Sequence, residues 1–124
     1  MDVTDQLEDH QARCFPHLLT LRMLARYTPE ASLPWLAVTE VTRATGAILA
    51  EVEAAVRAVT GGGPRGTAGP GIGIFLGVRL SRLAAAADDA IAAAGAGDFT
   101  QLRTHLRRFD TLTAAIWAVQ DASR

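Results

Sequence analysis

The chain has 124 residues and a formal net charge of -1, from 12 basic and 13 acidic side chains. This length fits one domain with one core, and the balanced charge argues against nucleic-acid binding, which usually needs a basic excess. All the basic residues are arginine, which excludes a lysine Schiff base and the lysine of a phosphate-binding loop.

Helical periodicity predicts a first helix over about residues 4–27. Apolar and weakly polar residues recur there at alternating spacings of four and three, which is the repeat of one helix face. This interior line is Val3, Leu7, His10, Cys14, His17, Leu21 and Leu24. Pro16 interrupts the helix, because proline lacks a backbone N–H and clashes with the preceding turn. The segment is therefore either one kinked helix or a short helix followed by a second that starts near Pro16.

A second helix is expected after Ser32, a good N-cap, with Pro34 in its first turn. Its interior line is Val38, Val41, Thr45, Ile48, Val52, Ala55 and Val59. The run from Gly61 to Gly71 then predicts a flexible connection, because glycine and proline are dense there. Its length permits either a crossover or an exchange of hairpins between two chains.

A third helix is predicted over about residues 72–94 and a fourth from Asp98 onward. The third ends at Gly95–Gly97, and Asp98 with Gln101 three residues later is a capping-box pattern. The interior lines are Ile72, Leu76, Leu80, Leu83, Ala87 and Ile91, then Phe99, Leu102, Leu106, Phe109, Thr113 and Ile116. Gly69, Gly71, Gly73 and Gly77 resemble a dinucleotide loop but lie outside any βαβ unit. The four-residue spacing of Gly69, Gly73 and Gly77 instead indicates close helix approach or a continued linker.

No segment shows the alternation of a strand, so the predicted fold is all-α. Residues 1–124 form a single four-helix bundle, most simply antiparallel, with two helical hairpins joined by the connection at 61–71. The acidic, polar N-terminus is unlike a signal peptide, and no apolar run approaches the ~20 residues that span a bilayer. A cytoplasmic protein without a membrane segment is therefore expected.

The histidines and the single cysteine are the candidate ligand-binding residues. His10, Cys14 and His17 fall on the apolar arc of the first helix and His105 on that of the fourth, at about 100° per residue. Antiparallel packing of these helices would bring His105 within one or two turns of His17. Histidine could then act as a general base and Cys14 as a ligand or nucleophile. The alternative is core packing, and the Glu-x-x-His pairs of di-iron bundles are absent, so no metal or cofactor is identified.

Arginines and tryptophans suggest interaction surfaces. The densest basic group is Arg79, Arg82, Arg103, Arg107 and Arg108, which is either an anion-binding or acidic-partner surface or a solvated helix face. Trp35 and Trp117 suit the edge of a core or a protein interface. An alanine-rich bundle buries little apolar area alone, so a homodimer or a protein partner is expected. The predicted function is protein association, and the alternative is a small-molecule-binding, metal-binding or catalytic bundle using the histidines and Cys14.

Overall fold

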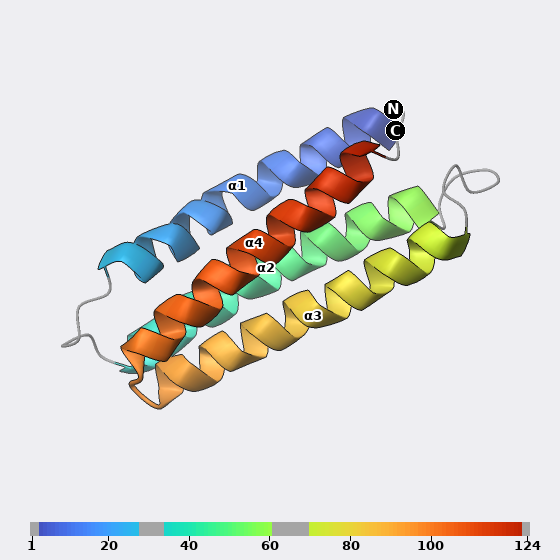
Figure 1. The fold of residues 1–124 in the computed structure, drawn as a ribbon. Helices are drawn as coiled ribbons and strands as arrows, with labels where there is room; N and C mark the ends of the chain where they lie inside the picture. Colours follow the sequence, from blue (N-terminus) through green and yellow to red (C-terminus); the bar gives the residue numbers. More distant parts are fainter. Residues whose placement is uncertain (1–2, 28–33, 61–69, 123–124) are drawn as a thin grey trace.

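The computed structural model describes residues 3–27, 34–60 and 70–122, and these ranges form four long helices (Figure 1). Helix α1 spans Val3–Tyr27, α2 Pro34–Thr60, α3 Pro70–Gly95 and α4 Phe99–Ala122. Helices α1 and α3 each pack against α2 and α4, so they occupy opposite corners of the bundle. Consecutive helices run in opposite directions (Figure 1). The predicted all-α, antiparallel four-helix bundle is confirmed.

Helix α1 is continuous through Pro16, which decides between the two alternatives for this segment. Pro16 cannot donate to the carbonyl of Ala12, but both residues are exposed, so water can solvate that carbonyl. One turn later the hydroxyl of Thr20 donates to the carbonyl of Pro16 at 3.1 Å. The proline is tolerated because it lies on the solvent side of the helix.

Helices α2 and α3 both begin at a proline, and the first of these starts was expected. Helix α2 begins at Pro34, as its first-turn position predicts. Helix α3 begins at Pro70, two residues before the expected start, so part of the predicted connection is helical. The predicted cap Ser32 and residues 61–69 of the connection lie outside the described residues.

The turn between α3 and α4 satisfies both helix ends. Gly97 has a φ of 72°, which a side-chain-bearing residue rarely adopts. Its N–H donates to the carbonyl of Ala94 at 3.1 Å, and the N–H of Asp98 donates to that of Ala93 at 3.0 Å, the Schellman pattern. The carboxylate of Asp98 then accepts from the N–H of Gln101 at 3.1 Å, which confirms the predicted N-cap. The reciprocal bond of a capping box, from the Asp98 N–H to the Gln101 side chain, is replaced here because the Asp98 N–H donates to the carbonyl of Ala93.

The core is drawn from all four helices. Its largest fully buried side chains are Leu7, Leu21, Val41, Ile48, Val52, Leu76, Leu83, Leu102, Leu106, Phe109 and Ile116. The threonines of the predicted lines, Thr45 and Thr113, are also buried, and each hydroxyl donates to the carbonyl four residues earlier, at 2.6 and 2.9 Å. Because these hydroxyls are satisfied locally, the apolar interior holds them without an unpaired group.

The interior line of α1 needs correction. Leu7, Cys14 and Leu21 are buried as predicted, but His10 and His17 are only half-buried at the border of the core. The prediction missed Leu18 and Ala25, which are buried. At about 100° per residue, His10 and His17 lie about 40–60° to one side of the line through Leu7, Cys14 and Leu21. Leu18 and Ala25 lie as far to the other side, which is the side that packs into the core.

Two glycines inside helices have no packing role. A Cβ added at Gly46 or Gly77 would meet no atom within 4 Å, so the expected close helix approach at Gly77 is wrong. No helix in the described ranges is both long and apolar enough to cross a lipid bilayer.

We predict opposite effects of alanine at two glycines. Gly46→Ala should raise the free energy of unfolding by about 0.5–1 kcal/mol, because it removes a flexible residue from an open site in α2. Gly97→Ala should lower it by about 1 kcal/mol, because alanine is strained at positive φ. Urea denaturation of both variants measures the two changes, and a stabilised Gly97→Ala variant would contradict the turn geometry.

Candidate functional site

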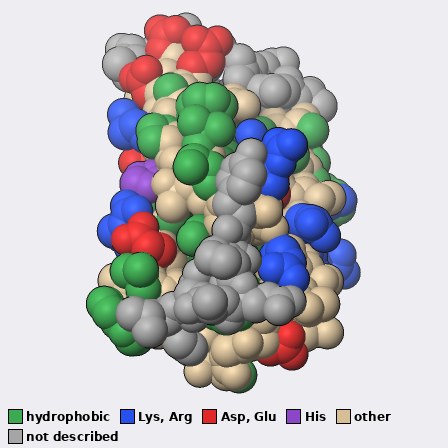
Figure 2. Space-filling model, turned by 90° about the vertical axis from the view of Figure 1, so that its left-hand side faces the viewer, with side chains coloured by type: hydrophobic (Ala, Val, Ile, Leu, Met, Phe, Trp, Pro, Cys, Tyr) green, Lys and Arg blue, Asp and Glu red, His purple; other side chains and the backbone are tan. Residues whose placement is uncertain are grey.

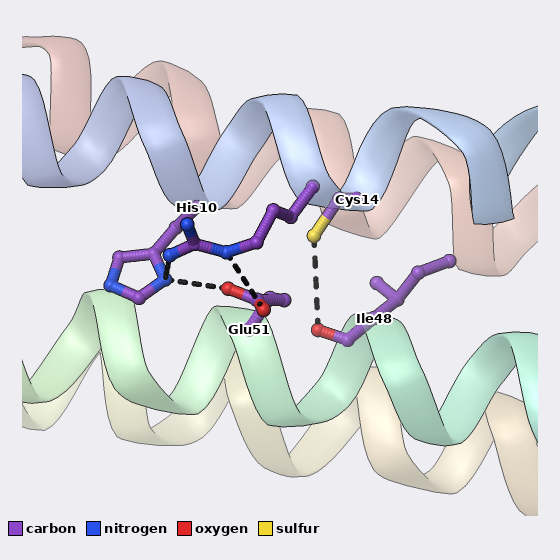
Figure 3. A network of polar contacts seen from close by, with 5 residues as sticks. His10, Cys14, Ile48 and Glu51 are labelled. Carbon is purple, nitrogen blue, oxygen red and sulfur yellow. Dashed lines mark hydrogen bonds and ion pairs between the residues drawn. The ribbon is translucent and has the colours of Figure 1, made fainter.

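A polar cluster links α1 to α2 (Figure 3). The Nδ1 atom of His10 lies 2.6 Å from Oε2 of Glu51, and Nε of Arg13 donates to Oε1 of the same carboxylate at 3.1 Å. His10 and Arg13 stand three residues apart on α1, so both reach across to one residue of α2. The side chains of His10 and Glu51 are 17% and 25% exposed. The cluster is therefore a half-buried bridge at the edge of the core.

The short contact to Glu51 assigns the protons of His10. In the neutral imidazole, Nδ1 carries the hydrogen that it donates to the carboxylate, and Nε2 keeps the lone pair. A nitrogen of Arg13 also lies 3.1 Å from Nδ1, but an Nδ1 that donates to Glu51 cannot accept from it. A carboxylate that orients an imidazole in this way is the arrangement used in general-base pairs.

The charges of the cluster favour the ionised form of Glu51. Desolvation at the helix interface is the largest contribution and raises the pKa of this carboxyl. Hydrogen bonds from His10 and Arg13, together with their charges, outweigh it, and the pKa of Glu51 lies below its ordinary value. The carboxylate is therefore an anchor for two α1 side chains at neutral pH.

Cys14 lies next to this cluster but inside the core. Its side chain is 0% exposed, and its Sγ lies 4.0 Å from the carbonyl oxygen of Ile48. Burial, and then the negative charge of Glu51, raise the pKa of the thiol to about 12, against a smaller opposing effect of Arg13. The thiol is neutral at pH 7, and a neutral buried thiol behaves as a small apolar side chain. This environment argues against a nucleophile.

The four predicted ligand-binding residues do not meet in one place. His17 follows His10 by seven residues and shares its α2-facing side of α1. His105 precedes Asp110 by five residues, about 140° around α4. Because Asp110 pairs with Arg22 of α1, this turn points His105 away from that contact. Its buried Nδ1 has no hydrogen-bond partner. In the part of the chain that the structure describes, no three His, Cys, Asp or Glu residues are grouped to hold a metal ion.

A basic groove lies between α1 and α4. It encloses about 340 Å³ and is lined by Leu21, Arg22, Ala25, Arg26, Leu106, Arg107 and Asp110. Two nitrogens of the Arg22 guanidinium donate to the two carboxylate oxygens of Asp110, at 2.8 and 3.0 Å. This bidentate pair joins the first and last helices of the chain. Sequence reasoning missed it because its partners lie 88 positions apart.

The predicted arginine surface is divided between sides of the bundle. Arg107 lines the α1–α4 groove, whereas Arg108 is about 100° further around α4. On α3, the guanidinium of Arg79 lies 4.3 Å from the ring centre of Phe75, and its buried Nε has no hydrogen-bond partner. Arg82 and Arg108 are exposed and Arg103 is half-buried. Arg107 and Arg108 therefore point to different sides of α4.

An exposed apolar column runs along the outer side of α1. Phe15, Leu19 and Met23 are 54%, 41% and 61% exposed, and their spacing of four places them on one helix stripe. Figure 2 shows exposed hydrophobic side chains below a group of acidic side chains and beside arginines. The spacing of four is visible in the sequence, but the interior line through Leu7 and Cys14 is more regular and is the stronger periodic signal.

The two tryptophans have different environments. Trp35 is 64% exposed at the start of α2, so it stays a candidate for an interface. Trp117 is 5% exposed and lines a hollow of about 310 Å³ with Phe15 and Leu18. Its ring therefore belongs to the edge of the core, the other of the two expected positions.

Comparison with known proteins finds no matching family model, no matching curated protein and no matching solved structure. The chain's own geometry is therefore the basis for a functional assignment. The apolar column of α1 is more exposed to solvent than the polar cluster of His10 and Glu51.

The burial of Cys14 predicts an alkaline loss of stability. The unfolded thiol ionises near 9.0, whereas the folded thiol ionises near 12. Stability is therefore complete below pH 9 and falls as pH rises toward 12, by about 1.4 kcal/mol per pH unit. Urea denaturation from pH 8 to 11 should show a shallower decline for Cys14→Ala than for the natural protein. Parallel curves would contradict the buried neutral thiol.

Glu51 should stabilise the fold in the opposite pH range. Because its folded pKa is lowered, its contribution is present above the ordinary value of 4.5 and is lost as pH falls through the folded pKa. Glu51→Gln should cost about 1 kcal/mol at pH 7 and little at pH 2. The matched control Glu53→Gln, at an exposed residue of the same helix, should change stability little at either pH. An equal cost at both pH values would show that the charge of Glu51 is not what matters.

Proposed function

We propose that this protein acts by self-association, with the outer side of α1 as the docking surface. We call the residues Ala12, Phe15, Leu19 and Met23 the α1 face. A single exposed apolar side chain is ordinary on a protein surface. A continuous column on one helix, with three large side chains each more than two-fifths exposed, is typical of a surface that a second helix covers. This column is the observation that carries the proposal.

Helix α1 already uses its other side within the bundle. Leu7, Cys14 and Leu21 are buried against the neighbouring helices, so the helix has two apolar sides and the chain covers one of them. A helix with apolar residues on two of its sides can be packed on both of them.

The surface beside the column is shaped to receive side chains. Phe15 borders one hollow of about 390 Å³ with Glu8, Gln11 and Ala12, and another of about 310 Å³ that reaches α4. The α4 wall of the second hollow includes Ala114 and Ala118, both small and exposed. Small residues beside large ones let a partner helix approach closely and seat its own side chains.

The composition of the core also favours association. Helix α3 contributes mainly alanine to the interior, at Ala86, Ala87, Ala90, Ala93 and Ala94. Each alanine removes less apolar area from water than a leucine would. Covering Phe15, Leu19 and Met23 would add burial that the bundle alone does not have.

The alternative of ligand binding or catalysis by His10, Cys14, His17 and His105 has less support. Among the described residues no three His, Cys, Asp or Glu side chains are grouped to hold a metal ion, and the Cys14 thiol is neutral at pH 7 because burial raises its pKa. His10 has a suitable orientation, but the hollows described above for the placed residues of α1 are lined by other side chains.

Sedimentation over a wide range of protein concentration tests the proposal. The natural chain should show a concentration-dependent dimer, and Leu19→Glu should weaken it by more than about tenfold because the carboxylate would be buried in the interface. Circular dichroism should show an unchanged helical fold, since Leu19 is exposed in the single chain. The matched control is Val78→Glu on α3, at a residue 48% exposed.

The control variant should associate like the natural chain. A chain that stays monomeric at every concentration would overturn the proposal, as would a dimer that survives Leu19→Glu and is lost in Val78→Glu.

A further inference from the structure

We propose that the α1 face docks on the α1 face of a second copy in antiparallel orientation, with Glu8 of each copy opposite Arg26 of the other. This inference rests on the proposed self-association and specifies its partner and geometry. It follows from the order of charged and apolar residues along the exposed stripe of α1.

The stripe extends beyond the apolar column at both ends. At about 100° per residue, spacings of three and four continue it through acidic residues before Ala12 and a basic residue after Met23. In chain order it is Asp5, Glu8, Ala12, Phe15, Leu19, Met23 and Arg26. The stripe is therefore acidic at the start of α1, apolar in the middle and basic at the end. Asp5, Glu8 and Arg26 are all exposed.

Such a stripe is complementary to itself when it is reversed. A twofold axis that crosses α1 at the level of residue 17 places Phe15 of one copy opposite Leu19 of the other. The same axis places Glu8 opposite Arg26. Each contact occurs twice, because a twofold interface uses the same surface on both copies. The twofold rotation would thus form three contacts on each side of the axis. These are the ion pair of Glu8 with Arg26, the apolar pair of Phe15 with Leu19, and a contact of Ala12 near Met23.

A parallel pairing lacks this complementarity. It would place Glu8 beside Glu8 of the second copy, and Arg26 beside Arg26. Like charges at the rim of an interface oppose association and select against the wrong orientation. The antiparallel arrangement also sets the helix macrodipoles in opposite directions, which is favourable.

The charge order has a second effect within one chain. Acidic residues near the start of a helix and basic residues near its end stabilise it through the macrodipole, and Glu8 and Arg26 also interact with neighbours in the chain. Neither effect accounts for three exposed large apolar residues between the charges. Antiparallel docking uses both the charges and the apolar column.

Disulfide trapping distinguishes the two orientations. Antiparallel docking brings residue 12 of one copy next to residue 23 of the other, so a mixture of Ala12→Cys and Met23→Cys chains should form a disulfide-linked heterodimer. Each variant alone should not, because its two cysteines would lie about 15 Å or more apart, beyond the ~7 Å Cα separation that a disulfide spans. Cys14 is buried and identical in both variants. Non-reducing electrophoresis of the folded proteins is the readout.

Charge reversal tests the proposed ion pairs. Glu8→Arg alone and Arg26→Glu alone should each weaken the dimer by about tenfold, because each replaces two attractions with two repulsions. Mixing the two variants should restore association as a heterodimer, since every opposed pair is then of opposite sign. Arg57→Glu, the same change at an exposed residue of α2, is the matched control and should have little effect.

The outcomes separate this inference from the function on which it rests. Disulfide formation by Ala12→Cys alone would show a parallel pair and overturn the antiparallel geometry. A dimer that depends on Leu19 but neither cross-links in the mixture nor responds to charge reversal would overturn the α1–α1 contact while self-association stands. A natural chain that never dimerises would overturn both proposals.

Discussion

The rotation of α1 about its own axis is the constraint on which the rest of the structure depends. Leu7, Cys14 and Leu21 must be buried against α2 and α4, and this requirement sets every other direction on the helix. One flank then carries His10 and Arg13 toward Glu51 of α2. The opposite flank carries Arg22 to Asp110 of α4. The remaining side, with the exposed column, is left to solvent.

This rotation also explains why the polar residues of α1 hold the bundle together rather than forming a reactive centre. The polar links lie at the two borders of the core, where partly exposed ion pairs align neighbouring helices. Cys14 stands between these borders in apolar surroundings, and its raised pKa follows from that position. His105 faces away from α1, so the imidazoles do not share one environment.

The small side chains of the interior and the large exposed side chains of α1 both favour association. Alanines on α3 allow close helix packing but remove little apolar surface from water. The α1 face is exposed apolar surface that a second molecule can cover, and its acidic-to-basic order supports recognition of the same surface reversed. Association of this kind draws on the apolar middle for affinity and on the charged ends for orientation.

Local chemistry in the sequence determined the four helices, the start of α2 at Pro34 and the turn at Gly97 and Asp98, because caps, prolines and glycines act on their own backbone. The interior line of α4 also follows from periodicity alone, because all six of its predicted residues are buried. In the lines of α2 and α3, Val38, Leu80 and Ile91 are only half-buried, and the side chains of Val59 and Ile72 lie outside the described residues. Only the tertiary structure decided which flank of α1 faces inward. His10 and His17 lie about 40–60° to one side of Leu7, Cys14 and Leu21, and Leu18 lies as far to the other side, so periodicity alone could not show that the Leu18 flank is the buried one. The tertiary structure also decided where the arginine side chains point. Arg107 and Arg108 are neighbours in the chain, but helix packing placed one in the α1–α4 groove and turned the other away, because adjacent residues on a helix point about 100° apart.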